Sequence, residues 1–449
     1  MFVPHTESER QEMLKTIGKE SISDLFVDIP KDFRFPEIKL PPPLTESEVL
    51  NEIRALAEAN NSCDDMICFL GAGAYHHYIP SAVDAILSRG DFFTAYTPYQ
   101  PEVSQGTLQA IFEFQSLMCN LTGMDVSNAS HYDGATAAAE ACLSAFHHFR
   151  GERKKFIISC FLNPHYHETI KTYLSVLDNV EIIESSFSED TESIHLLTEN
   201  IDDNTAMVIV QYPDFLGKIF DYSLLAAEVH GKGSLLAVSA NPIALGLLKP
   251  PSDFGADFVI GEGQPLGIPM SFGGPYLGFF TAKKEYLRRI SGRIVGQTED
   301  KNGDKGYVLT LTAREQHIRR EKAISNICTN QGLMALAATV YLSVLGRNGL
   351  RKVAELCYQK AHYAANQIGR IPGYKILGKE KFFNEFVVSC PTSVQKINDQ
   401  LLSEGVISGL PLEDYYPILK DCMLVAVTEM NTKEEIDLFV SLLEEASNV

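Results

Sequence analysis

Basic side chains are scarce relative to acidic ones in this sequence of 449 residues. Lys and Arg together number 38 against 58 Asp and Glu, which gives a formal net charge of −20 at pH 7. A surface of this sign repels the phosphates of nucleic acids and the headgroups of anionic lipids. We therefore expect neither a nucleic acid nor a membrane as a partner, and a solvated acidic surface is the simpler explanation of the charge.

Paired cysteine motifs, apolar leaders and long apolar runs are also missing. The nine cysteines are scattered from Cys63 to Cys422 without a CxxC pair, which indicates reduced thiols that mostly fill core positions. The opening MFVPHTESERQEML lacks the apolar centre of a secretion signal, and we expect no apolar run that spans a bilayer. These absences predict a cytoplasmic protein.

The first part of the chain combines helix-start signals with a proline-rich stretch. TESE occurs at Thr6–Glu9 and again at Thr45–Glu48, and each repeat predicts a capped helix, the second over about 46–59. The intervening DIPKDFRFPEIKLPPPL is too rich in proline for a helix or a sheet interior. An apolar extended arm of this kind indicates packing on a neighbouring subunit.

Between about residues 134 and 282, short β-rich runs alternate with helical stretches. The runs are KFIISC, VEIIES, AMVIVQ, SLLAVS, DFVIG and LGFFTA. Helical stretches such as 165–177 and 221–230 separate them. Continuous apolar strands between helices predict a mainly parallel sheet that helices cover on both faces. The fold class is therefore α/β.

Beyond this region the pattern changes. Segment 292–312 is polar and Gly-rich, which predicts a loop or hinge. Helices over about 330–346 and 349–370, and then EFVVSC and CMLVAV with two further helices, predict a smaller lobe. The length suits two or three domains that share a core. The expected parts are the N-terminal arm and helices at 1–60, a large α/β domain at 61–312, and long helices with a small C-terminal α/β domain at 313–449.

Two motifs bear on a cofactor site. In HYDGATAAAEACLSAF, Asp133 caps a helix and Gly134 allows close backbone approach, a start that attracts an anion but equally suits an Ala-rich core helix. In GADFVIGEGQPLGIPMSFGGPYLGFF, residues 255–280, a strand runs into a Gly-rich loop. This succession resembles the large domain of the fold-type-I pyridoxal-phosphate enzymes. The resemblance implies a cofactor phosphate at a helix start, a strand-borne Asp at the pyridinium nitrogen and a Schiff-base Lys in the loop.

The chain departs from that pattern at the reactive positions. The resemblance aligns Gln264 and Pro265 with a His-Lys pair, and no lysine lies between positions 249 and 283. Val238-Ser239 stands where the strand-borne Asp is expected. Proline has no amine for an imine, and neither Val nor Ser holds a pyridinium proton by charge. We therefore expect no catalytic residue on this chain.

Three longer stretches narrow the resemblance. They are FLGAGAYHHYIP at 69–80, FFTAYTPYQPEVSQGTLQAIFEFQ at 92–115 and LTAREQHIRREKAISNICTNQGLMAL at 311–336. Together they resemble the P-proteins of glycine decarboxylase, both the amino-terminal half of the single-chain form and the first subunit of the two-subunit form. The length of the chain favours the two-subunit form.

The resemblance implies a partner that carries the chemistry. A paralogous second subunit is expected to bind pyridoxal 5'-phosphate covalently through its lysine. The pair, with two copies of each subunit, is expected to decarboxylate glycine and to pass the aminomethyl group to the lipoyl arm of H-protein. The alternatives are a cofactor-free scaffold or regulatory protein of this fold, and a self-sufficient pyridoxal-phosphate aminotransferase that uses another lysine.

Two segments are expected to reach the partner's active site. Tyr96, Tyr99, Gln100 and Glu102 share an irregular loop that needs many polar partners, although tyrosines are also common at plain interfaces. A second set, the polar residues just before a long helix, is expected to contact the cofactor phosphate in trans. This set comprises Ser325, Asn326 and Thr329.

Two other groups of side chains are candidates for an anion contact and for a metal site. The basic run from Arg314 to Lys322 suits either a solvated helix face or a contact with carboxylates or an anionic cofactor. The histidine pairs at 76–77, 147–148 and 165/167 lack the spacing of zinc ligands, so no metal is expected.

Overall fold

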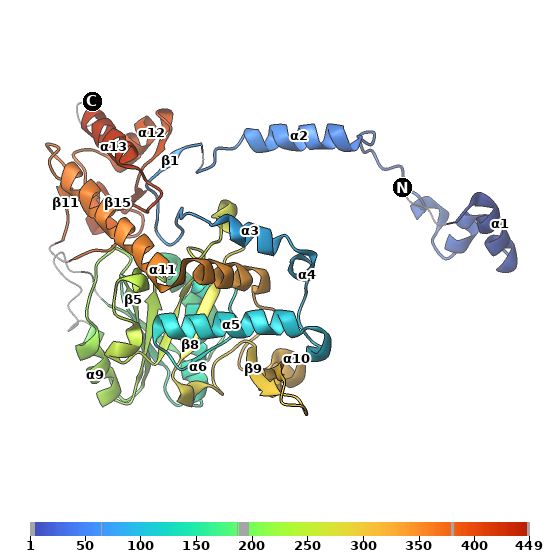
Figure 1. The fold of residues 1–449 in the computed structure, drawn as a ribbon, viewed down its shortest axis with the longest axis horizontal. Coiled ribbons are helices and arrows are strands. Elements are labelled where there is room, and N and C mark those ends of the chain that lie inside the picture. The colour runs from blue at the N-terminus through green and yellow to red at the C-terminus, as the bar shows by residue number, and fades with distance from the viewer. Residues whose placement is uncertain (1–4, 64, 186, 188–196, 379–380, 447–449) are drawn as a thin grey trace. The chain divides into compact units, whose positions relative to one another are not determined.

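The computed structural model describes residues 5–63, 65–185, 187, 197–378 and 381–446 (Figure 1). These residues form two compact units, 1–61 and 62–449. The first unit contains α1 (Glu7–Thr16) and α2 (Glu46–Glu58), each preceded by the predicted capping box. At the start of α2, the Thr45 N–H donates to Glu48 Oε2 over 2.8 Å, and the Glu48 N–H donates to Thr45 Oγ1 over 3.4 Å.

The first unit has almost no core of its own. Of its described residues, 5–61, Leu14 alone is buried. Phe33, Ile38 and Leu40 of the proline-rich arm are 77%, 71% and 75% exposed. Exposed apolar side chains grouped in this way are typical of surfaces that bind another protein segment.

A seven-stranded sheet forms the centre of the second unit, in the order β2-β8-β7-β6-β5-β3-β4. Its strands are β2 (Val126–Ser127), β3 (Lys155–Ile158), β4 (Glu181–Glu184), β5 (Thr205–Tyr212), β6 (Leu235–Ala240), β7 (Phe258–Glu262) and β8 (Gly278–Ala282). The strands from β4 to β7 are parallel, whereas β8 is antiparallel to β7 and to β2. The mainly parallel sheet predicted from the sequence is confirmed.

Apolar residues on the strands point alternately to the two faces of this sheet, and each face carries its own core. Met207 and Ile209 of β5 pack with α6 (Gly134–His148) and α7 (Pro164–Leu174). Val208 and Val210 pack on the opposite face with helices α5 (Gln105–Thr122), α9 (Ser223–Gly231) and the first half of α11 (Gly332–Ile368). Figure 1 shows α5 and this half of α11 side by side.

Segment 292–312, predicted as a loop or hinge, instead forms a β-hairpin. Strands β9 (Ile294–Glu299) and β10 (Lys305–Thr310) pair antiparallel. The carboxylate of Asp300 accepts the N–H groups of Asn302 at 2.7 Å and Asp304 at 2.9 Å, which builds the turn. The buried Val295 packs on α5. The prediction was wrong because the polar turn residues obscured the short apolar runs on either side.

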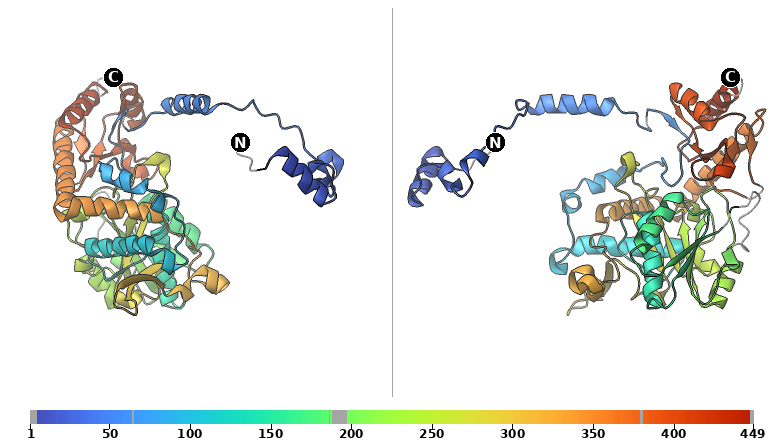
Figure 2. Two further views of the ribbon diagram at one scale, coloured as in Figure 1. Left: turned by 45° about the vertical axis from the view of Figure 1, so that its right-hand side comes forward. Right: turned by 180° about the vertical axis from the view of Figure 1, so that it is seen from behind.

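A smaller antiparallel sheet, β11-β12-β15-β14, forms the C-terminal part of the unit. Its strands are β11 (Lys375–Ile376), β12 (Glu385–Ser389), β14 (Leu410–Pro411) and β15 (Cys422–Ala426), and its helices are α12 (Val394–Ser403) and α13 (Lys433–Ala446). The second half of α11 packs in the same core. Figure 2 shows α12 and α13, in red, beside the C-terminus. A separate pair, β1 (Ile67–Cys68) with β13 (Val406–Ile407), attaches the segment after residue 62 to this part.

Helix α11 is long, and its two halves pack against the seven-stranded and the four-stranded sheet, respectively. The remaining helices are short. The short ones are α3 (Ser81–Leu87), α4 (Gly90–Phe93) and α10 (Gln316–Arg319). Two successive helices were predicted where α11 lies, and the structure breaks α11 at Gly346, whose φ is 58°. By length and composition α11 passes as a membrane span, contrary to the sequence expectation, but 44% of its apolar window is buried within the protein.

Candidate functional site

The carboxyl ends of the parallel strands border a small cavity, at the edge of the sheet where α/β enzymes bind their ligands. Its volume is about 40 Å³. Gln211 at the end of β5, Ser239 of β6 and Glu262 of β7 line it, together with Tyr166 and Pro265. The sequence placed Ser239 and Pro265 at the reactive positions of a cofactor site, and the structure brings them to one cavity.

The residues of this cavity do not fit pyridoxal phosphate. One ordered water needs roughly 10–15 Å³ of such space, so about 40 Å³ holds a few waters and not a cofactor of that size. Pro265 offers no amine, and Ser239 offers a neutral hydroxyl where a carboxylate would face a pyridinium nitrogen. Among the residues that line the cavity, there is neither Lys nor Arg.

Glu262 fills the space between this cavity and the start of α6. Its Oε2 accepts the N–H of Gly134 at 2.9 Å, and its Oε1 accepts the N–H groups of Gln264 at 2.9 Å and Leu277 at 3.0 Å. Burial raises the pKa of the Glu262 carboxyl to about 8, against the opposite effect of these donors. The Asp133 carboxylate caps the same helix by accepting the Thr136 N–H at 2.7 Å.

Gln264, which aligns with the histidine of the His-Lys pair, has a structural role in this chain. Its Nε2 donates to the carbonyls of Tyr75 at 3.0 Å and Ile268 at 2.7 Å, and its Oε1 accepts the Tyr75 N–H at 2.9 Å. The Tyr75 hydroxyl donates to Glu385 Oε2 at 2.8 Å, and burial raises the pKa of Glu385 to about 7. Segment 69–80 is thereby fastened to both sheets.

The roles of Glu262 and Glu385 escaped the sequence analysis. Each lies at a strand end or on a strand that the sequence did predict, but their hydrogen-bond partners come from distant segments of the chain. The glycines that follow Glu262 could have indicated its role. A carboxyl group next to a Gly-rich loop and a helix start can accept hydrogen bonds from backbone N–H groups.

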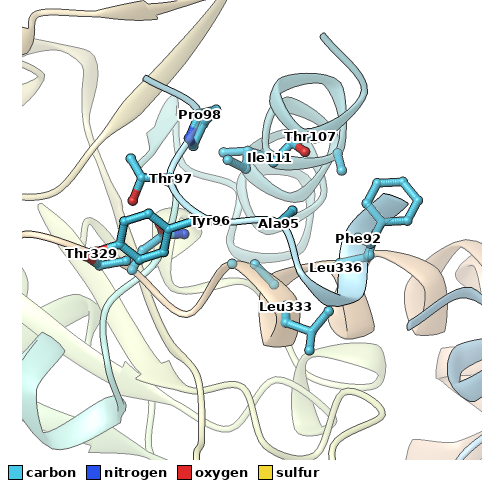
Figure 3. Close-up of a pocket in the computed structure, with 14 residues that line it drawn as sticks. Phe92, Ala95, Tyr96, Thr97, Pro98, Thr107, Ile111, Thr329, Leu333 and Leu336 are labelled. Carbon is cyan, nitrogen blue, oxygen red and sulfur yellow. The ribbon is translucent and has the colours of Figure 1, made fainter. Parts of the chain in front are cut away.

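A second cavity, of about 130 Å³, brings two predicted segments together (Figure 3). Tyr96 and Thr97 of the 92–115 stretch line it, and so do Thr329 and Asn330 ahead of α11. Tyr96 is 72% exposed, so most of its ring is free for another contact. Helices α5 and α11 supply the apolar wall.

The other residues of the predicted loop lie outside this lining. Tyr99 covers the buried Arg293, whose guanidinium carbon lies 5.5 Å from the ring centroid. Arg293 also pairs with Glu315, with 3.4 Å between Nε and Oε2. Gln100 and Glu102 are exposed at the surface.

The predicted phosphate-contact residues are placed differently from one another. Ser325 donates its hydroxyl to Glu140 Oε1 of α6 at 2.6 Å, so this group serves its own chain. Burial raises the pKa of Glu140 to about 7. Asn326 is exposed, and Thr329 borders the 130 Å³ cavity. Asn326 and Thr329 are therefore accessible from outside the chain, whereas the Ser325 hydroxyl points inward to Glu140.

Two remaining groups have internal partners. Arg314, at the start of the basic run, donates to the carbonyls of Ile290 and Gly292, the latter at 2.7 Å. His77 Nδ1 lies 2.7 Å from Glu429 Oε2, and these atoms and Cys357 Sγ lie within 4.8 Å of one another, as metal ligands can. The Cys357 thiol, however, donates to Glu429 at 3.3 Å, so the cluster is already hydrogen-bonded within the chain.

Comparison with known proteins agrees with this geometry. The glycine cleavage system P-protein family matches residues 1–443. The probable glycine dehydrogenase (decarboxylating) subunit 1 of Thermomicrobium roseum is 52% identical over 448 residues and covers 100% of both chains. A protein of the same description from Desulforamulus reducens is 52% identical over 443 residues, which are 98% of this chain and 99% of the relative.

Solved structures give the same result. A crystal structure of glycine decarboxylase (P-protein) of the glycine cleavage system, in inhibitor-bound form, has a TM-score of 0.91 at 40% identity and covers 99% of this chain and 100% of that chain. Lactobacillus brevis glutamate decarboxylase has a TM-score of 0.69 at 12% identity over 96% and 97%, which shows the fold alone. The fold-type-I architecture predicted from the sequence is confirmed. The chain belongs to the glycine cleavage system P-protein family.

Proposed function

We propose that this chain is the first subunit of a two-subunit glycine dehydrogenase (decarboxylating). With a paralogous second subunit it decarboxylates glycine and transfers the aminomethyl group to the lipoyl arm of H-protein. One observation carries this proposal: the chain has the fold of the family, yet Pro265, which the sequence resemblance aligns with the Schiff-base lysine, lines a cavity of only about 40 Å³. The relatives described as subunit 1 over their full length support the same assignment.

In this proposal pyridoxal phosphate is held by the second subunit, and this chain completes that subunit's site from outside. The wall around the 130 Å³ cavity is the part of this chain that we assign to the boundary. Tyr96 and Thr329 meet there, Asn326 lies exposed nearby in the chain, and Tyr99, Gln100 and Glu102 continue the same exposed loop. This placement supports the assignment of both segments to the shared site.

The same proposal extends to the assembly and its location. Two copies of each subunit form the complex, and the apolar arm around residues 28–43 is covered in it by another subunit. The exposure of Phe33, Ile38 and Leu40 supports a covered arm. Cytoplasm is the proposed compartment, in agreement with the nine free cysteines.

Reconstitution separates this function from its alternatives. The chain, the second subunit and their mixture are each supplied with glycine and lipoylated H-protein, and release of carbon dioxide is measured. We expect the mixture alone to be active. We also expect no phosphopyridoxyl-lysine in residues 249–283 after pyridoxal phosphate and borohydride are added to the chain by itself.

Each alternative has its own outcome. Activity of the second subunit without this chain would make the chain a scaffold or regulator. A stoichiometric phosphopyridoxyl-lysine on the isolated chain would make it a self-sufficient pyridoxal-phosphate enzyme.

A further inference from the structure

The start of α6 meets a negative side chain of its own protein. A helix of 15 residues presents free N–H groups and the positive end of its dipole at its first turn, and this end favours an anion. In this chain the acceptor within reach of Gly134 is the carboxyl group of Glu262. No ligand is needed to satisfy that N–H group.

We propose that the Glu262 carboxylate takes the position of a cofactor phosphate at the start of α6 and thereby excludes phosphate esters from this chain. The inference goes beyond the proposed function, because it concerns this chain alone and needs no partner. It also explains why the cavity at the strand ends is small as well as lacking a lysine.

Three elements converge on this one carboxylate. Its two oxygens accept N–H groups from Gly134 at the start of α6, from Gln264 after β7 and from Leu277 just before β8. Cradles of converging backbone N–H groups are typical binding places of phosphate oxygens. Here each of the three donors is already bonded to Glu262.

Space and charge exclude a phosphate in addition to this side chain. A Cβ atom added at Gly134 would lie 2.0 Å from the Tyr166 hydroxyl oxygen and 2.9 Å from the Glu262 backbone nitrogen, so the helix start is in contact with the chain around it. A phosphate dianion would also have to displace the Glu262 carboxyl group from its three N–H donors, with no Lys or Arg in the cavity lining to compensate the dianion's charge.

Removing the carboxylate should therefore create an anion site. The full chain and its Glu262→Ala variant are titrated with inorganic phosphate, and binding is followed by calorimetry and by phosphorus NMR. We expect phosphate to bind the variant at least tenfold more tightly than the unaltered chain. Phosphate that binds both equally would overturn the proposal, as would a folded variant that binds no better than the unaltered chain.

Glu385→Ala is the matched control. It also removes a buried carboxylate near the cavity, one that accepts the Ala72 N–H at 2.7 Å and the Tyr75 hydroxyl but touches no helix start. We expect this variant to bind phosphate no better than the unaltered chain. A gain equal to that of Glu262→Ala would mean that lost negative charge alone admits phosphate, and the proposal would fall.

Glu262→Gln covers the case in which the alanine variant does not fold. A carboxamide has one acceptor oxygen for three N–H donors, so at least one of Gly134, Gln264 and Leu277 must lose its partner. Amide hydrogen exchange at these residues should accelerate at least tenfold at one or more sites. Unchanged exchange at all three would refute the anchoring role of Glu262, while an active complex with unaltered subunits would leave the proposed function standing.

Discussion

At the residue scale, three buried glutamates have strongly shifted pKa values. Glu140, Glu262 and Glu385 all have their pKa raised by burial, to about 7, 8 and 7. Hydrogen-bond donors surround each of these carboxyl groups, and within the described residues none of the three forms an ion pair with Lys or Arg. Groups of this kind make stability depend on pH.

Glu140 gives the cleanest test of that dependence. Its folded pKa of about 7 lies above the usual 4.5, so the folded state holds a proton that the unfolded state releases as pH rises. The stability that it contributes is complete below pH 4.5 and is lost as pH rises towards 7, by about 3 kcal/mol at most. The unfolding free energy of Glu140→Gln, followed by denaturant titration, should fall less over this interval than that of the unaltered chain.

Neighbouring groups define the controls for that measurement. Tyr173, Ser291 and Ser325 face Glu140, and the ring of His131 is hydrogen-bonded to Ser291. Burial lowers the pKa of His131 to about 3, which opposes the trend below pH 6.5. The difference between variant and unaltered chain removes this contribution. The exposed Glu228→Gln is the control. A profile for Glu140→Gln parallel to that of the unaltered chain would show that the pKa of Glu140 does not change on folding.

At the scale of elements, the segment just before α11, residues 325–331, lies next to the loop that contains Tyr96. These two segments form the proposed site. Thr329 and Asn330 border the same cavity as Tyr96, although the two segments are far apart in sequence (Figure 3). Ser325 is fixed to α6 by its bond to Glu140, which holds the segment in place. The element thus has an inward side that anchors it and an outward side that is free for a partner.

Replacing Asn326 and Thr329 together with Ala should weaken cofactor binding in the assembled complex. Loss of one hydrogen bond to a charged phosphate costs about 1.5–3 kcal/mol, roughly ten- to a hundredfold in affinity. Titration of the cofactor-free complex with pyridoxal phosphate measures this.

Ser325→Ala is the matched control for that titration, because its hydroxyl faces Glu140 of the same chain. It should lower thermal stability and leave cofactor affinity within about twofold. Unchanged affinity in an assembled Asn326/Thr329 double variant would reduce the segment to a helix cap.

The elements were largely predictable from the sequence, and the exceptions have physical causes. Apolar runs and capping boxes located β3 to β8 and α2, because both signals are local. The β9–β10 hairpin was missed because its strands are short and its turn is polar. The anchoring of Gly134 by Glu262, and of Tyr75 by Gln264 and Glu385, depends on contacts between distant segments that no local pattern records.

At the scale of the whole molecule, an exposed apolar unit accompanies a compact one. The described residues of the unit 1–61 bury almost nothing by themselves, whereas the unit 62–449 contains the seven-stranded and the four-stranded sheet with their cores. Such a division is expected of a chain that buries the apolar surface of one unit against another subunit.

Deleting residues 28–43 should therefore weaken assembly with the second subunit. Obligate interfaces typically bury more than roughly 2,000 Å². In the proposed assembly, the deletion removes the exposed Phe33, Ile38 and Leu40 from this interface. Sedimentation should show dissociation at concentrations where the unaltered complex stays intact.

A polar change in the same segment, Lys31→Ser with Lys39→Ser, is the control and should sediment like the unaltered complex. An arm deletion that leaves the assembly intact would contradict the assignment of this segment to the interface.

The small cavity beside Glu262 also limits which mutations could give this chain a cofactor site. Substituting lysine for Pro265 would aim an amine at a space of about 40 Å³, and removing Glu262 would free three N–H groups without supplying an anchor. Neither change alone restores a cofactor site, and each carries its own cost in stability. A cofactor site would therefore need several changes in this chain at once, and no single one of these mutations would produce it.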